Sequence, residues 1–200
     1  TKKLLARLKN EGKKIYLIPP GGSNATGALG YVQCALELSQ QFSDQKIRKP
    51  ILIHASASAG TQSGLIFGFK SLGLSLKTIG VNVYHDQPDS LKEKIQTLLE
   101  HLNLKHRLSN NDLNAKGSIN IDHSYLGEGY GIPSRNTIDA IKLTASLEGI
   151  AFDPVYSGKA LEAVIDQINL GYFGSEQDVV IIHTGGAFSL PVYQDAFANP

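Results

Sequence analysis

Hydrophobic residues along the chain gather in short runs that are closed by glycine, proline or polar residues. Within these runs the apolar side chains do not alternate with polar ones, which is typical of strands buried on both faces of a parallel sheet. The pattern predicts five such strands, at residues 15–18, 51–55, 78–83, 118–121 and 179–182.

The segments between these runs carry apolar residues three and four positions apart, the spacing of one helical face. They predict helices over residues 1–10, 24–42, 60–72, 90–102, 135–147 and 159–170. Ser23 or Asn24 is suited to cap the second helix. Ser90 with Glu93 resembles a capping box for the fourth. Residues 105–117 are polar and are expected to be irregular. Strands that alternate with helices predict an α/β fold, a mainly parallel sheet with helices on both faces.

The composition describes one globular domain of ordinary size. Of the 200 residues, 42% are hydrophobic and 18% are charged, so the chain has enough apolar material for a substantial core. A formal net charge of +1 gives no electrostatic basis for binding nucleic acid or an anionic membrane, and neither partner is expected. No apolar run approaches the roughly 20 residues that cross a bilayer.

Cys34 is the single cysteine, which excludes an internal disulfide and favours a reducing compartment. The N-terminal residues lack the apolar core of a secretory signal, so we expect a cytoplasmic protein. The chain also begins inside a helical pattern without a clear capping residue before it, which suggests a piece of a longer protein.

The junction between the strand at 51–55 and the following helix carries candidate chemistry. The residues of this turn are small: Ala57, Ser58, Ala59, Gly60 and Thr61. Backbone N–H groups at the start of a helix have no intrahelical acceptor, and the helix dipole is positive there. The junction therefore predicts a phosphate site, with a tightly packed junction without a ligand as the alternative.

Two more glycine-rich loops follow predicted strands, at residues 21–30 and 184–186. The carboxyl ends of parallel strands meet at one edge of a sheet, and ligands bind beyond that edge. We therefore expect all three loops to open on the same side of the sheet.

Familiar motifs for nucleotide, hydrolase and metal chemistry are missing. The sequence contains no Walker loop, no three-glycine dinucleotide fingerprint and no Gly-x-Ser-x-Gly elbow. Its six histidines are scattered without ligand spacing, so no metal site is expected. Tyr130 and Tyr156 lie in glycine-containing loops that can present their rings to a ligand, with loop packing as the alternative. Lys159, at the start of a helix, is expected to be solvated rather than to act as a catalytic amine.

Six stretches, taken together and in order, resemble the family of pyridoxal-phosphate enzymes that contains D-cysteine desulfhydrase and 1-aminocyclopropane-1-carboxylate deaminase. The stretches are GGSNATGALGY (21–31), AGTQSG (59–64), YGIP (130–133), LEGI (147–150), DPVYSGK (153–159) and HTGGA (183–187). They span nearly all of the chain.

This resemblance implies the tryptophan-synthase-β-like fold. Residues 1–20 would be the remnant of a small inserted domain, and residues 21–200 would be the large cofactor-binding domain. The resemblance also implies pyridoxal 5'-phosphate as the cofactor, a small amino acid as the substrate and a homodimer as the assembly.

The family pattern further implies roles for individual residues. The loop at residues 57–61 would cradle the cofactor phosphate. Tyr156 matches the tyrosine beside the cofactor ring, and Tyr130 matches a second active-site tyrosine. Thr184 is placed to meet the pyridine nitrogen, and Ser157 occupies a cofactor-binding position nearby.

Ser157 helps to choose between two activities. The deaminases resemble Val-Tyr-Glu-Gly at this point, with an acid that would keep the pyridine nitrogen protonated, whereas serine or threonine is similar to the desulfhydrase branch. The prediction is β-elimination of D-cysteine, or a related D-amino acid, to pyruvate, sulfide and ammonia. The alternative within the family is conversion of 1-aminocyclopropane-1-carboxylate to 2-oxobutanoate and ammonia.

One part of the family pattern is missing from these 200 residues: the Schiff-base lysine in a Gly-Asn-Lys stretch and a downstream Ser-Asn substrate site. We therefore expect an N-terminal, lysine-bearing segment of the same protein as a partner, and no turnover by this chain alone. Two alternatives remain: a non-catalytic domain that binds a phosphate ligand, and a flavodoxin-like phosphate binder.

Overall fold

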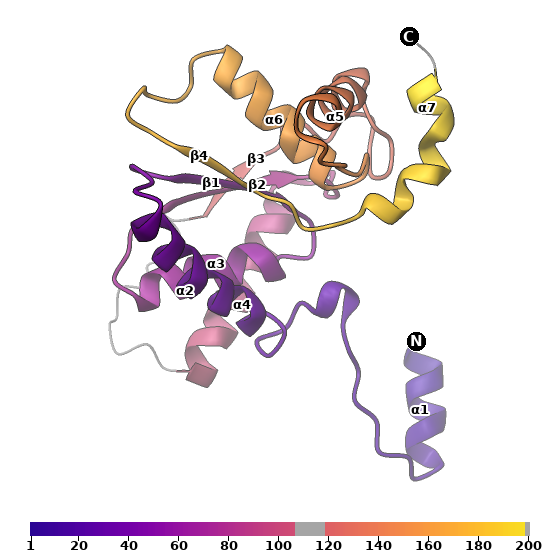
Figure 1. The fold of residues 1–200 in the computed structure, drawn as a ribbon. Helices are drawn as coiled ribbons and strands as arrows, with labels where there is room; N and C mark the ends of the chain where they lie inside the picture. The colour runs from indigo at the N-terminus through magenta and orange to yellow at the C-terminus, as the bar shows by residue number, and fades with distance from the viewer. Residues whose placement is uncertain (107–118, 199–200) are drawn as a thin grey trace.

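The computed structural model of the chain describes residues 1–106 and 119–198. At its centre is a four-stranded parallel sheet in the order β3-β2-β1-β4 (Figure 1). The strands are β1 (Ile51–Ser56), β2 (Lys77–Asn82), β3 (Asn120–Asp122) and β4 (Val179–Ile182). In the register of the sheet, Ile53 of β1 lies between Ile79 and Ile181.

Helices cover both faces of this sheet (Figure 1). One face carries α2 (Leu29–Asp44), α3 (Gly60–Ser71) and α4 (Pro88–His106), and the other carries α5 (Arg135–Glu148) and α6 (Ser157–Asn169). α1 (Lys2–Asn10) lies apart from this body. Short 3-10 helices at Pro20–Gly22 and Ala187–Tyr193 and the helix α7 (Gln194–Ala198) complete the described elements. The prediction of an α/β fold with a parallel sheet between two helical layers is confirmed.

Alternate residues of β1 anchor two apolar clusters, one on each face. Ile51 and Ile53 pack with residues of α6, such as Ala160, whereas Leu52 packs with Leu65 and other residues of α2 and α3. This double burial explains why the strand has no polar alternation. None of the helices in the described ranges is long and apolar enough to cross a bilayer.

The strand predicted at residues 15–18 is absent. This segment is not part of a strand, and Tyr16, Leu17 and Ile18 are exposed. An apolar run records a tendency to be buried, but a strand also needs a neighbour to accept its hydrogen bonds. No strand among the described residues pairs with this segment.

Two helix starts also differ from the prediction. α2 begins at Leu29, because Asn24 Oδ1 accepts hydrogen bonds from the backbone N–H groups of Thr26 (3.0 Å) and Gly27 (2.8 Å) and so holds a turn before the helix. α4 begins at Pro88, so the capping box predicted at Ser90 is wrong and this serine lies inside the first turn. The predicted irregular stretch falls mostly on residues 107–118, outside the described part of the chain.

Two glycines of α3 allow α2 to approach it closely. An ideal Cβ on Gly68 would lie 2.6 Å from Ala35 Cβ, and one on Gly64 would lie 2.6 Å from Tyr31 Cβ. We expect Gly68→Ala to lower the free energy of unfolding by about 1–3 kcal/mol, because the helices must separate to admit the methyl group. Chemical denaturation measures this change.

Gly30, in the first turn of α2, is the matched control for this substitution. A Cβ there would meet nothing within 4 Å. Gly30→Ala should leave stability unchanged or raise it by up to about 1 kcal/mol, because alanine favours the helix. Equal destabilisation by the two substitutions would contradict the close-packing explanation.

His54 is a fully buried histidine of β1. Its Nδ1 lies 2.8 Å from the carbonyl oxygen of Ala55 and must donate to it, and its Nε2 has no hydrogen-bond partner in the described structure. Burial lowers the pKa of His54 to about 4 from the ordinary 6.5. The imidazole is therefore neutral in the fold at pH 7.

This shift predicts a loss of stability in acid. Between pH 6.5 and pH 4 the unfolded chain binds a proton that the folded protein does not, so the free energy of unfolding should fall by about 3 kcal/mol as the pH is lowered through this window. Urea titrations at several pH values measure it. His54→Leu should remove this part of the pH dependence, and an unchanged profile in that variant would contradict the assignment.

Candidate functional site

A cavity, which we call the main cavity, lies beyond the carboxyl ends of β1 and β4. These two strands are neighbours in the sheet, and the chain leaves β1 toward β2, on the other side. This is a topological switch point, where open α/β sheets bind ligands. The cavity has a volume of about 680 Å³, which suits a small organic ligand.

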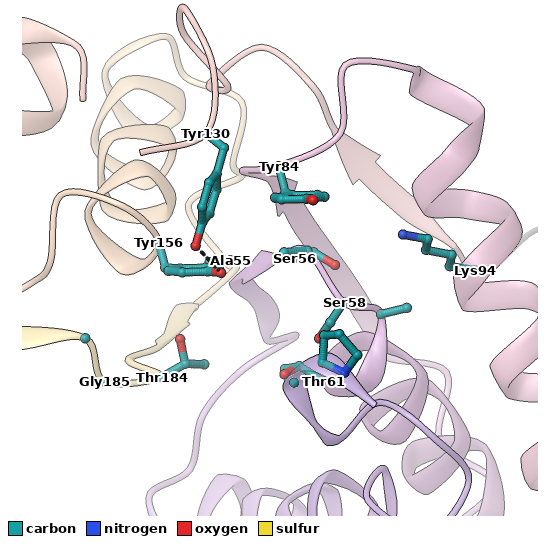
Figure 2. A pocket seen from close by; sticks show the side chains of 15 residues that line it. Ala55, Ser56, Ser58, Thr61, Tyr84, Lys94, Tyr130, Tyr156, Thr184 and Gly185 are labelled. Carbon is teal, nitrogen blue, oxygen red and sulfur yellow. Dashed lines mark hydrogen bonds between the residues drawn. The ribbon is translucent and has the colours of Figure 1, made fainter. Parts of the chain in front are cut away.

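Residues from seven separated segments line this cavity (Figure 2). They are Pro20, Gly21, Ala55, Ser56, Ala57, Ser58, Ala59, Thr61, Tyr84, Lys94, Tyr130, Tyr156, Thr184, Gly185 and Gly186. The structure thus brings together seven of the nine residues that the sequence marks as candidates. The other two, Gly60 and Ser157, are not among the lining residues.

The segment from Ala57 to Thr61 comprises the turn after β1 and the first two residues of α3, and we call it the cup. Ala59 adopts a left-handed backbone conformation (φ 75°), which a residue with a Cβ rarely takes, and no side chain caps α3. The first N–H groups of α3 therefore lack a partner within the helix and are available to an anion.

Glycines and serines pack closely around the cup. An ideal Cβ on Gly21 would lie 2.5 Å from Ser58 Oγ, and one on Gly60 would lie 2.7 Å from Ser23 Oγ. Ser23 Oγ donates a hydrogen bond of 2.7 Å to Ser58 Oγ. The loop that begins at Gly21 thus holds the Ser58 side chain in place. Gly60 has no side chain, which leaves room for Ser23 to approach the cup.

Three tyrosines form the opposite wall (Figure 2). The hydroxyls of Tyr130 and Tyr156 share a hydrogen bond of 2.8 Å, and their rings meet edge to face with centroids 5.6 Å apart. The Tyr84 ring meets Tyr130 in the same manner at 5.0 Å. Burial, followed by the hydrogen bond with Tyr130, raises the pKa of Tyr156 above its ordinary value of 10. Both conditions favour a neutral phenol that can donate or accept one proton.

Asp153 organises the loop that carries Tyr156. This buried carboxylate accepts hydrogen bonds from the backbone N–H groups of Val155 (2.9 Å), Tyr156 (2.8 Å) and Ser157 (2.7 Å). The hydroxyl of Ser157 donates to the same carboxylate at 2.5 Å and lies 3.3 Å from the carbonyl oxygen of Gly185. Ser157 is therefore buried directly behind the cavity wall.

The expectation that Lys159 is solvated is wrong. Its side chain is fully buried, and Nζ donates to the carbonyl oxygens of Leu126 (2.5 Å) and Gly129 (2.9 Å). Burial lowers the pKa of this lysine. Its role is to hold the loop that presents Tyr130, which sequence spacing did not reveal because the acceptors lie about 30 residues away.

Tyr84 and Lys94 are lining side chains that sequence reasoning missed. Tyr84 follows the end of β2, so the rule that ligands meet the carboxyl ends of strands offered a signal for it. Lys94 reaches toward the cavity from α4 (Figure 2). It lies next to the buried Ile95 on an amphipathic helix, where a lysine is normally only solvated. No cluster of metal-binding side chains occurs in the described parts of the chain.

The arrangement fits a phosphorylated aromatic cofactor. The cup offers backbone donors and serine and threonine hydroxyls for a phosphate, and Tyr156 offers a ring face or edge across the cavity. Gly186 packs directly against Asp153, and an ideal Cβ on this glycine would lie 2.5 Å from Asp153 Cγ. Thr184 supplies a hydroxyl at the end of β4.

Comparison with known proteins agrees with this chemistry. A family model described as pyridoxal-phosphate dependent enzyme matches residues 1–185. The chain is 41% identical to a D-cysteine desulfhydrase of Klebsiella pneumoniae subsp. pneumoniae over 191 residues, and 40% identical to that of another strain of the species. These matches cover 95% of the chain and 56% of each relative, so the chain spans about half the length of the curated relatives that it matches.

Solved structures give the same fold. An ACC deaminase homologue superposes with a TM-score of 0.82 at 28% identity, over 98% of this chain and 57% of that one. The processed form of threonine deaminase isoform 2 from Solanum lycopersicum superposes with a TM-score of 0.55 at 19% identity, over 97% and 55% of the two chains. The second likeness concerns the fold alone.

Proposed function

Because the chain belongs to the family of pyridoxal-phosphate dependent enzymes, we propose that the complete protein eliminates sulfide from D-cysteine, or a related D-amino acid, to give pyruvate and ammonia. The observation that carries this proposal is the cup, which faces a hydrogen-bonded tyrosine pair across one cavity at the switch point of the sheet. The relatives of about 40% identity named D-cysteine desulfhydrase support the choice of substrate.

In this proposal the chain supplies the phosphate site, the two tyrosines and the contact to the pyridine nitrogen. Backbone N–H groups of the cup and the hydroxyls of Ser58 and Thr61 bind the phosphate. Tyr156 would pack beside the pyridine ring, and Thr184 would meet its nitrogen. When bound, pyridoxal phosphate supplies an electron sink for the charge that develops at the substrate α-carbon.

The tyrosine pair holds a proton near the reacting atoms. A tyrosine phenol is ordinarily neutral at physiological pH, and the raised pKa of Tyr156 reinforces this state. Tyr130 can return or withdraw a proton through the shared hydrogen bond. A neutral phenol is suited to protonate a leaving group or to orient the substrate, and it adds no negative charge to the cavity.

Other parts of the proposed enzyme lie outside these residues. The chain contains no Gly-Asn-Lys stretch, and its relatives are longer. We therefore assign the lysine that holds the cofactor, and the Ser-Asn substrate site, to a further segment of the same protein. In this scheme residues 1–20 belong to a small domain, residues 21–200 form the large domain, and the active protein is a homodimer.

Ser157 supports the desulfhydrase branch over the deaminase branch. Its hydroxyl donates a hydrogen bond to the Asp153 carboxylate and lies 3.3 Å from the carbonyl oxygen of Gly185. The position is therefore suited to a small neutral side chain. The ACC deaminase homologue with a TM-score of 0.82 favours the second candidate, deamination of 1-aminocyclopropane-1-carboxylate to 2-oxobutanoate.

A comparison of products tests the two candidates. The full-length natural protein, loaded with pyridoxal phosphate, is given D-cysteine, L-cysteine or 1-aminocyclopropane-1-carboxylate, and sulfide and 2-oxobutanoate are measured. We expect sulfide and pyruvate from D-cysteine that depend on the cofactor. Oxobutanoate without sulfide would favour the deaminase, and no product from any of the three would reject both.

A further inference from the structure

His85 lies outside the main cavity and yet contacts the loop that lines it. It follows β2 and is 7% exposed. Its Nε2 lies 2.7 Å from the carbonyl oxygen of Ala57, the first residue of the cup. A carbonyl can only accept, so Nε2 carries the hydrogen and donates it. The other ring nitrogen, Nδ1, lies 3.3 Å from the hydroxyl of Ser90, which can donate to it.

The direction of this hydrogen bond fixes a peptide group of the cup. In a trans peptide the C=O of one residue and the N–H of the next point in opposite directions, and the described chain has no cis peptide. His85 lines a neighbouring cavity and not the main one. The Ala57 carbonyl therefore points toward His85, and the N–H of Ser58, a residue that lines the main cavity, points the opposite way.

His85 is itself held in place by the sheet. Asn82, the buried last residue of β2, accepts from the His85 N–H at 2.9 Å and donates to its carbonyl oxygen at 2.7 Å. The ring of Tyr84 meets the imidazole edge to face at 4.9 Å. These contacts hold His85 against the cup, so a hydrogen bond links the end of β2 to the Ala57 carbonyl.

We propose that His85 is a positioning residue for the cofactor phosphate: by holding the Ala57 carbonyl it preorganises the Ser58 N–H as a donor to that group. This inference rests on the proposed function in that it takes the ligand of the cup to be a phosphate. Without the imidazole donor, the Ala57–Ser58 peptide is free to rotate. Ordering it on binding then costs affinity for the phosphate, but not for the rest of the cofactor.

The test compares two ligands that differ only in the phosphate group. In the full-length natural protein, His85→Phe keeps an aromatic ring but lacks the donor, whereas His85→Gln keeps a donor. We expect His85→Phe to weaken pyridoxal phosphate binding by about tenfold, the effect of one hydrogen bond, and to leave pyridoxal binding unchanged. His85→Gln should retain most of the affinity, and His85→Phe should shift the phosphorus-31 resonance of bound pyridoxal phosphate.

A control variant separates the possible outcomes. His101, exposed on α4, provides the matched control, and His101→Phe should change neither affinity. An equal loss of affinity for both ligands in His85→Phe, or unchanged pyridoxal phosphate binding, would overturn the inference, since a merely structural histidine would not act on the phosphate alone.

Backbone nitrogen-15 relaxation keeps the inference testable even if the proposed function fails. If the unchanged protein binds pyridoxal and pyridoxal phosphate equally well, the cofactor assignment of the cup is wrong. His85→Phe should still increase the fast motion of the Ser58 and Ala59 N–H groups in the ligand-free protein, and leave β2 unaffected. Unchanged motion in the cup would reject the positioning role independently.

Discussion

Replacing Thr61 with glutamate is expected to weaken pyridoxal phosphate binding by at least about 1,000-fold. Thr61 is the second residue of α3 and lines the cavity at the cup. A carboxylate there would face the phosphate, and two like charges about 4 Å apart in a partly desolvated site repel by about 4 kcal/mol. Each 1.4 kcal/mol is a factor of ten in affinity. Titration of the cofactor, followed by its absorbance, measures the change.

Thr61→Ser is the control, because it keeps the hydroxyl and should change affinity by less than about threefold. Unchanged binding of pyridoxal phosphate by Thr61→Glu would show that the phosphate lies elsewhere. The same pair of variants separates an enzyme from a non-catalytic phosphate-binding domain. Both would lose the ligand in Thr61→Glu, but only an enzyme forms a product that depends on the cofactor in Thr61→Ser.

The strands that the sequence predicted correctly are those whose neighbours lie within the described chain. β1 and β4 fall almost where the apolar runs placed them, because helices bury both faces of the sheet there. The segment at 15–18 has an equally apolar pattern, but it finds no strand to pair with. The hydrophobic pattern of a segment predicts that it is buried, whereas its pairing with another strand depends on the rest of the fold.

The C-terminal helices escaped prediction for the opposite reason. Phe188 and Val192 are almost fully exposed, so the 3-10 helix Ala187–Tyr193 buries no apolar face that could mark it in the sequence. One tertiary contact of this helix is the hydrogen bond that the Tyr193 hydroxyl donates to the carbonyl oxygen of Gly131, 62 residues away. Periodicity cannot report a helix that has no buried stripe.

Most of the candidate site follows from one topological rule. Loops after parallel strands share an edge, and this rule brought the cup, Thr184 and the glycines after β4 into one prediction. The contacts behind the wall could not be predicted in this way. His85 and Ala57 are 28 residues apart, and the bond between them depends on the turn geometry that Asn82 imposes.

Replacing Asp153 with alanine is expected to lower the free energy of unfolding by about 3–5 kcal/mol. The carboxylate is 1% exposed and satisfies three backbone N–H groups and the Ser157 hydroxyl. Its removal leaves these buried donors without an acceptor, which costs far more than one hydrogen bond contributes. It also opens a gap against Gly186, whose backbone packs on the carboxylate. Denaturant unfolding of the variant measures the loss.

Asp139→Ala provides the matched control, because that carboxylate forms an exposed ion pair with Arg135 on one helix and should contribute less than about 0.5 kcal/mol. Asp153→Asn should fall between the two, since the amide keeps one acceptor oxygen but turns an N–H₂ group toward the backbone donors. A loss of less than about 1 kcal/mol in the free energy of unfolding of Asp153→Ala would mean that water can replace the carboxylate as acceptor. Asp153 would then not be what fixes Tyr156 opposite the cup, and the geometry of the tyrosine pair would have to come from the packing of α6 alone.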